Sequence, residues 1–100
     1  MTTIDDWPFD EPRNLAVFTT RQVLDDNEPV LEVYHDGDGD WQFIGDTGGN
    51  ETNCCIIALE TAINLDRSMK ELADLPLGFR AIRKNADSRW IRSPNPRESC

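Results

Sequence analysis

The chain lacks any long apolar run, which limits the classes of protein to which it can belong. No window approaches the roughly 18 apolar residues of a membrane-spanning helix. The acidic start, residues 1–6, also lacks the basic and then apolar order of a secretory signal peptide. We therefore expect a cytoplasmic protein that neither spans nor binds a membrane.

Cysteine and histidine are scarce. The chain has three cysteines, an odd number that gives no disulfide framework, and one histidine, His35. The adjacent Cys54 and Cys55 lack the Cys-x-x-Cys spacing of zinc sites, and one histidine cannot complete a tetrahedral set alone. We predict no metal and no cofactor. Because Cys54 and Cys55 lie in an apolar run, we expect them to be inert core residues.

Basic residues are nearly absent from the first two thirds of the chain. Residues 1–66 carry fifteen Asp and Glu against only Arg13 and Arg21, whereas residues 67–100 have a net charge of +4. Nucleic-acid binding needs clustered Lys and Arg to neutralise phosphates, so we expect no nucleic-acid partner. A formal charge of −9 favours a basic protein partner or cations.

The pattern of apolar residues predicts the α+β class, with a mostly antiparallel sheet of four or five strands and two or three short helices. The strands are expected at residues 15–19, 30–35, 41–44, 54–58 and 78–84. Residues 54–58 hardly alternate, which is typical of a central strand. Thr19 with Gln22 and Ser68 with Glu71 have the spacing of capping boxes and predict two helix starts.

The domain boundaries follow from prolines and charge. Residues 1–13 form an acidic arm, residues 14–92 a single α+β domain, and residues 93–100 a flexible tail. In the arm, Trp7 and Phe9 either pack onto the domain or form an exposed docking segment, and packing is the favoured interpretation.

The most informative segment is an acidic turn, residues 35–43, in which Asp36, Asp38 and Asp40 alternate with glycines. An EF-hand would need Gly and Glu where the chain has Trp41 and Thr47, so this site is excluded. A hairpin turn, a weaker divalent-cation site and an acidic docking surface remain open. Trp41 is expected in the core.

These residues lead to a functional hypothesis. We expect a non-enzymatic domain that binds a basic protein partner through an acidic face, with no catalytic residue. The electrostatic contribution is assigned to Asp36, Asp38, Asp40 and Asp46. One alternative is a small hydrolase or metal-dependent enzyme that uses His35 with nearby acids. Another is a housekeeping adaptor protein.

Parts of the chain resemble a group of small, uncharacterised bacterial proteins and, more loosely, the immunity-protein-33-like family, also called domain of unknown function 2185. The matching segments, within residues 14–90, are Val17-Phe18-Thr19-Thr20-Arg21-Gln22-Val23-Leu24, Glu28-Pro29-Val30-Leu31, His35-Asp36 with Asp40-Trp41-Gln42-Phe43, and Leu72-Ala73-Asp74-Leu75-Pro76-Leu77-Gly78-Phe79-Arg80-Ala81. Immunity proteins bind and block a toxin, often by placing an acidic surface against a basic groove. The resemblance therefore implies a toxin as the basic partner.

Overall fold

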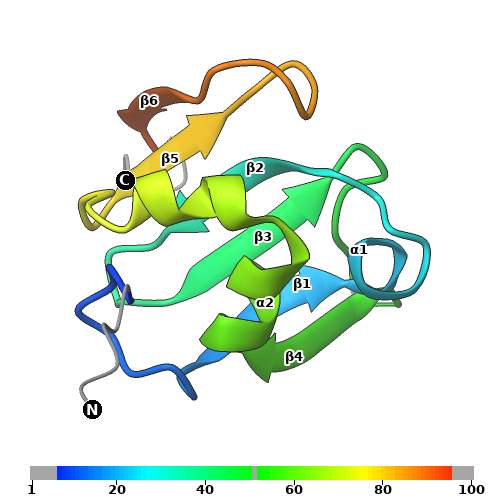
Figure 1. Cartoon of the computed structure of the whole chain (residues 1–100), viewed down its shortest axis with the longest axis horizontal. Helices are drawn as coiled ribbons and strands as arrows, with labels where there is room; N and C mark the ends of the chain where they lie inside the picture. The colour runs from blue at the N-terminus through cyan, green and yellow to red at the C-terminus, as the bar shows by residue number, and fades with distance from the viewer. Residues whose placement is uncertain (1–6, 51, 96–100) are drawn as a thin grey trace, which may run out of the picture.

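The computed structural model describes residues 7–50 and 52–95, which form a six-stranded sheet with short helices on one face (Figure 1). The strands are β1 (Ala16–Thr20), β2 (Val30–His35), β3 (Trp41–Gly45), β4 (Cys54–Ala58), β5 (Phe79–Ile82) and β6 (Ile91–Pro94). The helices are α1 (Arg21–Asp25), α2 (Leu59–Leu65) and the 3-10 helix η1 (Arg67–Leu72). The predicted α+β class is confirmed, with one strand more than the upper bound expected.

The strands follow the spatial order β4-β1-β3-β2-β5-β6. The predicted hairpin is present, because β2 pairs antiparallel with β3 and places His35 opposite Trp41. Only the β1–β3 pair is parallel among the described strands, so the sheet is mostly antiparallel as expected.

The position predicted for β4 is wrong. The strand lies at an edge of the sheet and pairs with β1 alone among the described strands. Its run of apolar side chains suggested burial on both faces. Instead, Ile56 is 66% exposed, because no helix in residues 7–50 and 52–95 covers the face to which it points.

The core lies between the sheet and the helices. Val17, Trp41 and Phe43 point from the sheet toward α2, which contributes buried Leu59 and Ile63. Each such side chain removed from water stabilises the fold by about 1.5–3 kcal/mol. The spacing of Leu59, Ala62 and Ile63 gives α2 a single apolar face. Trp41 is buried, so the prediction that it is a core residue is confirmed.

Both predicted helix caps are displaced along the chain. The side chain of Thr20, not Thr19, accepts a hydrogen bond from the Val23 backbone N–H, while the Thr19 hydroxyl donates to the Phe43 carbonyl. At η1 the side chain of Asp66 accepts from the Ser68 N–H at 3.0 Å. The actual cap lies one residue after the expected one at α1 and two residues before it at η1. Both caps have an extended conformation, and spacing alone did not identify them.

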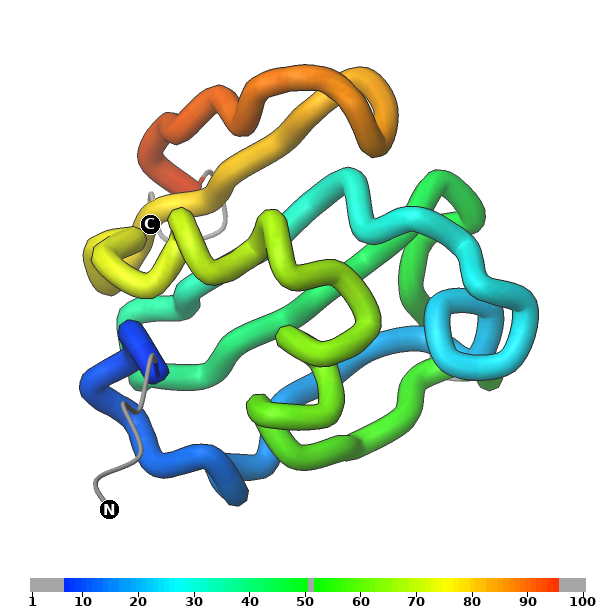
Figure 2. The backbone as a smooth tube through the Cα atoms, in the orientation of Figure 1, coloured from blue at the N-terminus to red at the C-terminus, as the bar shows by residue number. Residues whose placement is uncertain are grey.

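The described part of the acidic arm packs onto the domain, as predicted. Figure 2 shows this segment, in blue, running beside the start of β3. Phe9 is buried and meets the ring of Trp41 edge-on, with the ring centroids 5.5 Å apart. Trp7 packs behind Phe9. Residues 1–6 of the predicted arm lie outside the described residues.

The prediction of a flexible tail from residue 93 is wrong for its first three residues. Ser93 and Pro94 belong to β6, and Asn95 is 1% exposed. The backbone N–H of Asn95 donates to the Gly78 carbonyl at 2.7 Å, which extends the pairing of β6 with β5. Residues 96–100 lie outside the described residues.

None of the helices in the described ranges is long and apolar enough to cross a membrane.

Candidate functional site

The acidic segment forms the turn between β2 and β3. The Asp36 backbone N–H donates to the Asp40 carbonyl, and the Gly39 N–H donates back to the Asp36 carbonyl. Gly39 has a φ of 97°, a conformation that favours glycine. The Asp38 side chain accepts from the Asp40 N–H at 3.2 Å. The turn geometry accounts for the glycines and for part of the role of Asp38.

Among the described residues, the Asp36 side chain links separate elements of the fold, which the side chains of Asp38 and Asp40 do not. Its carboxylate accepts hydrogen bonds from Gln42 Nε2 at 2.8 Å and from Asn95 Nδ2 at 3.0 Å. These bonds join the turn to β3 and to the end of β6. Asp38 and Asp40 are exposed, so they remain available to a partner.

Asp46 does not lie with the other three predicted binding residues. It follows the last residue of β3, whereas Asp40 precedes the first. At about 3.3 Å per residue, the length of β3 separates them by roughly 20 Å. The sequence therefore identified carboxylates at two opposite ends of the sheet and not one continuous cluster.

His35 lies in a packed environment at the end of β2. Its ring stacks on Trp41 with the ring centroids 4.0 Å apart, and the residue is 7% exposed. Nδ1 lies 2.7 Å from the Leu75 carbonyl, which only accepts hydrogen bonds, so Nδ1 carries the proton. Nε2 lies 3.6 Å from a carboxylate oxygen of Glu11.

Glu11 is thus the acid that the fold brings to His35, from the arm 24 residues earlier in the chain. The same carboxylate oxygen accepts a hydrogen bond from Trp41 Nε1 at 3.0 Å. Nothing in the sequence linked Glu11 to the acidic turn. Within residues 7–50 and 52–95, no group of three His, Cys, Asp or Glu side chains is placed to hold a metal ion.

The expectation of two inert core cysteines is wrong for Cys54. Cys54 is exposed, Cys55 is half-buried, and both are free thiols. They point to opposite faces, as neighbours on a strand must. The reason for the error is that no described element covers the side chains of β4 that point away from the helices.

The face of the sheet opposite α2 and η1, here called the open face, has no helix over it among the described residues. Strand register aligns two rows of side chains across this face. One row runs Ile56, Phe18, Gln42, Tyr34, Arg80, Ser93. The next runs Cys54, Thr20, Ile44, Glu32, Ile82, Ile91. The open face is apolar over β4 and β1 and more polar toward β2 and β5.

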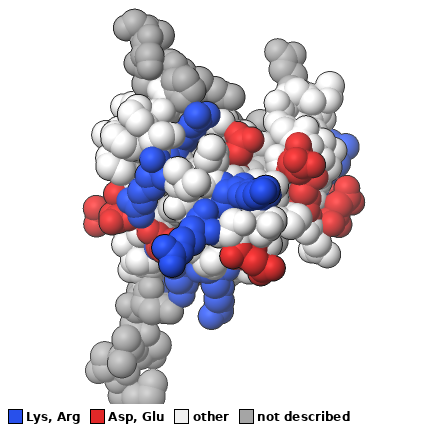
Figure 3. Space-filling view, turned by 90° about the horizontal axis from the view of Figure 1, so that it is seen from above, with Lys and Arg blue, Asp and Glu red and all other residues white. Residues whose placement is uncertain are grey.

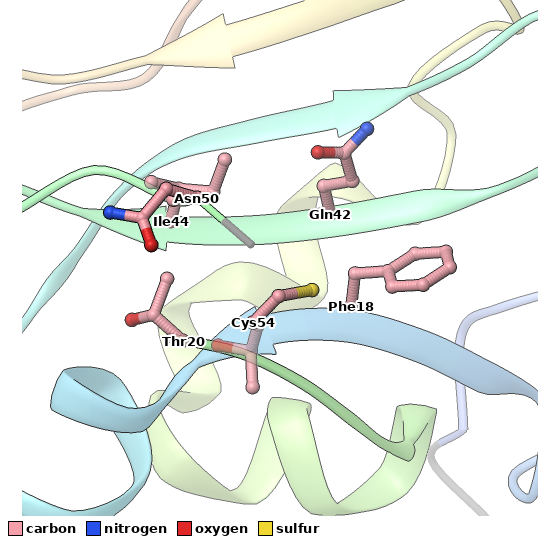
Figure 4. Close-up of a pocket in the computed structure, with 8 residues that line it drawn as sticks. Phe18, Thr20, Gln42, Ile44, Asn50 and Cys54 are labelled. Carbon is pink, nitrogen blue, oxygen red and sulfur yellow. The ribbon is translucent and has the colours of Figure 1, made fainter. Parts of the chain in front are cut away.

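A pocket of about 300 Å³ lies at the apolar end of the open face. Its lining comes from β1, β3, β4 and the loop before β4 (Figure 4), and includes Phe18, Thr20, Gln42, Ile44, Asn50 and Cys54. The loop is positioned by the buried Asn53, which donates to Gln22 Oε1 and to the Gly48 carbonyl. The part of the pocket wall that this loop contributes is therefore held in place by hydrogen bonds within the fold.

The polar part of the open face is internally paired. The Tyr34 hydroxyl donates to Glu32 Oε1 at 2.5 Å. Burial raises the pKa of Tyr34, and the neighbouring Glu32 carboxylate raises it further. Tyr34 therefore stays protonated and keeps donating to Glu32 at neutral pH.

The basic residues gather over β5 and β6, the sheet edge remote from β4. Figure 3, which looks onto this edge, shows Lys and Arg side chains close together with acids around them. Two of the arginines have acidic partners in the fold: Arg83 with Asp66 at 2.5 Å, and Arg92 with Asp74 at 2.6 Å. The charges of these two arginines are therefore balanced within the fold.

A sequence signal for the open face existed in β1 and β4. β4 is apolar at all five positions and β1 at three of its five, whereas a strand with helices on one side only needs apolar residues at alternate positions. The excess apolar residues lie in the exposed patch, but composition alone does not distinguish an open face from a covered one.

Comparisons of the chain with models of known protein families, with curated proteins and with solved structures each gave no match.

Proposed function

We propose that this chain is a non-enzymatic protein-binding domain whose partner docks on the open face. The observation that carries the proposal is the exposure of apolar side chains there, above all Ile56 at 66%, beside half-buried Phe18 and a pocket. Exposed apolar patches next to polar surroundings are typical of protein interaction sites. A pocket of about 300 Å³ has room for one apolar side chain of the partner.

The partner is basic. Carboxylates stand at both ends of β3, with Asp38 and Asp40 before it and Asp46 after it, and all three are exposed. The formal charge of −9 adds a long-range attraction for a cationic surface. Such charges raise the association rate and make it depend on salt, while the apolar patch contributes most of the affinity.

An inhibitor of a basic toxin is the most concrete form of this proposal, and it rests on the resemblance to immunity proteins. A cytoplasmic location also belongs to the proposal. A hydrolase that uses His35 has less support, because the ring is packed against Trp41 and its Nδ1 proton is bonded to a backbone carbonyl.

The test compares two matched substitutions. Phe18→Glu places a charge on the open face. Leu77→Glu places the same charge at a different site, a 57% exposed apolar residue in the loop before β5. Proteins retained from a host lysate by the wild-type chain and by Leu77→Glu, but not by Phe18→Glu, are candidate partners. Binding of each purified candidate is then titrated at low and high salt.

The expected result is a basic protein whose affinity falls on Phe18→Glu by tenfold or more, about 1.4 kcal/mol. Its association rate should fall with added salt and on Asp46→Asn. If no candidate distinguishes the two glutamate variants, docking on the open face is wrong. If binding is insensitive to salt, the assignment of a basic partner is wrong.

A further inference from the structure

The edge of the sheet formed by β4 has backbone groups that no described residue binds. In an antiparallel pair, the residues that bond their partner alternate with residues whose N–H and C=O point away from it. The Arg21 N–H donates to the Asn53 carbonyl, and the Leu59 N–H donates to the Leu15 carbonyl. Counting in steps of two between these bonds shows that the backbone N–H and C=O groups of Cys55 and Ile57 point toward β1.

It follows that Cys54, Ile56 and Ala58 direct their backbone groups outward from the sheet. The Cys54 N–H is occupied, because it donates to the Asn50 carbonyl. The Ala58 carbonyl is also occupied, because Ala58 is the N-cap of α2 and its carbonyl accepts the first helical bond. The Cys54 carbonyl, both backbone groups of Ile56 and the Ala58 N–H remain. Figure 1 shows β4 at the border of the sheet, with none of the other described strands beyond it.

This set of groups is complementary to itself about Ile56. If a second β4 lies antiparallel beside the first with Ile56 opposite Ile56, each Ile56 N–H meets the other's carbonyl. Each Ala58 N–H then meets the Cys54 carbonyl of the other copy. Every outward group finds a partner of opposite kind, and no group already bonded within the fold is needed.

The side chains and charges favour the same pairing. β4 carries no charged residue and no proline, the usual protections of an exposed edge. The opposite edge strand, β6, has both, in Arg92 and Pro94. In a molecule with a formal charge of −9, β4 is a segment where two copies can meet without facing like charges.

We propose that β4 is a self-association edge, through which two copies of this chain join their sheets into one continuous sheet. The two-fold contact is isologous, because the same strand is used by both copies. It brings the exposed Ile56 side chains together on the open face. Since the contact is one strand wide, we expect a weak dimer whose population depends on concentration. The proposal does not depend on the proposed function.

The first test measures the dimerisation constant of the full chain by sedimentation velocity over a range of concentrations. Ile56→Lys places like charges opposite each other and should weaken dimerisation by tenfold or more. Ile91→Lys is the matched control, since Ile91 is 65% exposed on the other edge strand, and it should dimerise as the wild type does. Circular dichroism checks that both variants are folded.

The second test needs no substitution and reports the register. Amide hydrogen exchange, followed by NMR at low and high protein concentration, should show protection of the Ile56 and Ala58 amides that rises with concentration. The Cys55 and Ile57 amides, which face β1, should be protected at both concentrations. A chain that stays monomeric, equal weakening by the two lysine variants, or concentration-independent exchange at Ile56 and Ala58 would each overturn the proposal.

Discussion

The carboxylate of Glu11 accepts a hydrogen bond from the indole Nε1 of Trp41 at 3.0 Å and thereby fixes the N-terminal arm to the largest side chain of the core. Trp41 is fully buried, so Glu11 is the group that satisfies the only polar atom of its side chain. The same carboxylate lies beside His35 Nε2. Arm, core and the end of β2 therefore meet at one acidic side chain.

Glu11→Ala should lower the free energy of unfolding by about 1–3 kcal/mol, because it leaves the buried indole N–H without an acceptor. Urea denaturation followed by tryptophan fluorescence measures this loss. Asp10→Ala is the control, since Asp10 is exposed beside Glu11. Equal losses in both variants would show that the arm's charge, and not this bond, matters for stability.

The predicted partner-binding carboxylates should differ in how much they contribute to stability. Asp36→Ala removes the acceptor of Gln42 and Asn95 and should cost about 1–2 kcal/mol. Asp46→Ala, at an exposed site, should change stability by less than about 0.5 kcal/mol. Thermal denaturation of the two variants tests the distinction, and a larger loss for Asp46→Ala would contradict it.

Stability should decrease in acid because of the Asp66–Arg83 pair. Burial alone would raise the pKa of Asp66, but hydrogen bonds from Ser68 and Arg83 outweigh it and hold the pKa below the ordinary 3.8. A carboxyl with a lowered pKa stabilises the fold above its unfolded pKa, and this contribution is lost as the pH falls through the folded pKa. The loss therefore begins near pH 4 and continues below it.

In Asp66→Asn this part of the pH dependence should be missing. At neutral pH the variant should be less stable by about 1–3 kcal/mol, because the Arg83 side chain is only 1% exposed and loses its counter-charge. Asp74→Asn is the comparison: the pKa of Asp74 is also lowered by Arg92, but the pair lies at the surface and should matter much less. Urea titrations at several pH values decide between these outcomes.

The two thiols of β4 should differ in reactivity in the native state. A water-soluble thiol reagent should modify Cys54 well before Cys55, because Cys54 is exposed on the open face and Cys55 is half-buried on the other. Quenched labelling followed by peptide mass spectrometry gives both rates. Faster labelling of Cys55 would contradict the placement of β4.

Local patterns predicted the strands and helices well, because alternation and spacing depend only on near neighbours. The hairpin of β2 and β3 and the apolar face of α2 were predictable in this way. The edge position of β4 was not, since an apolar strand has the same composition whether its second face is covered by protein or left open.

The candidate site was only partly predictable for a related reason. The sequence identified Asp36, Asp38, Asp40 and Asp46 from charge, and the strand expected at residues 41–44 already separates Asp46 from the other three. The contact of Glu11 with Trp41 and His35 joins distant segments, and no local pattern reports such a contact. The open face required knowledge of which side the helices occupy.

The place of β1 between β3 and β4 has a consequence for folding during synthesis. This strand is made first, yet both strands that flank it in the sheet come later along the chain. During synthesis β1 stays unpaired until β3 or β4 has been made, whereas β2 and β3 can form a local hairpin as soon as both have emerged from the ribosome. Because non-local pairing is slow, insertion of β1 into the sheet should be a late folding step. It is the step at which we expect chaperones to bind most readily.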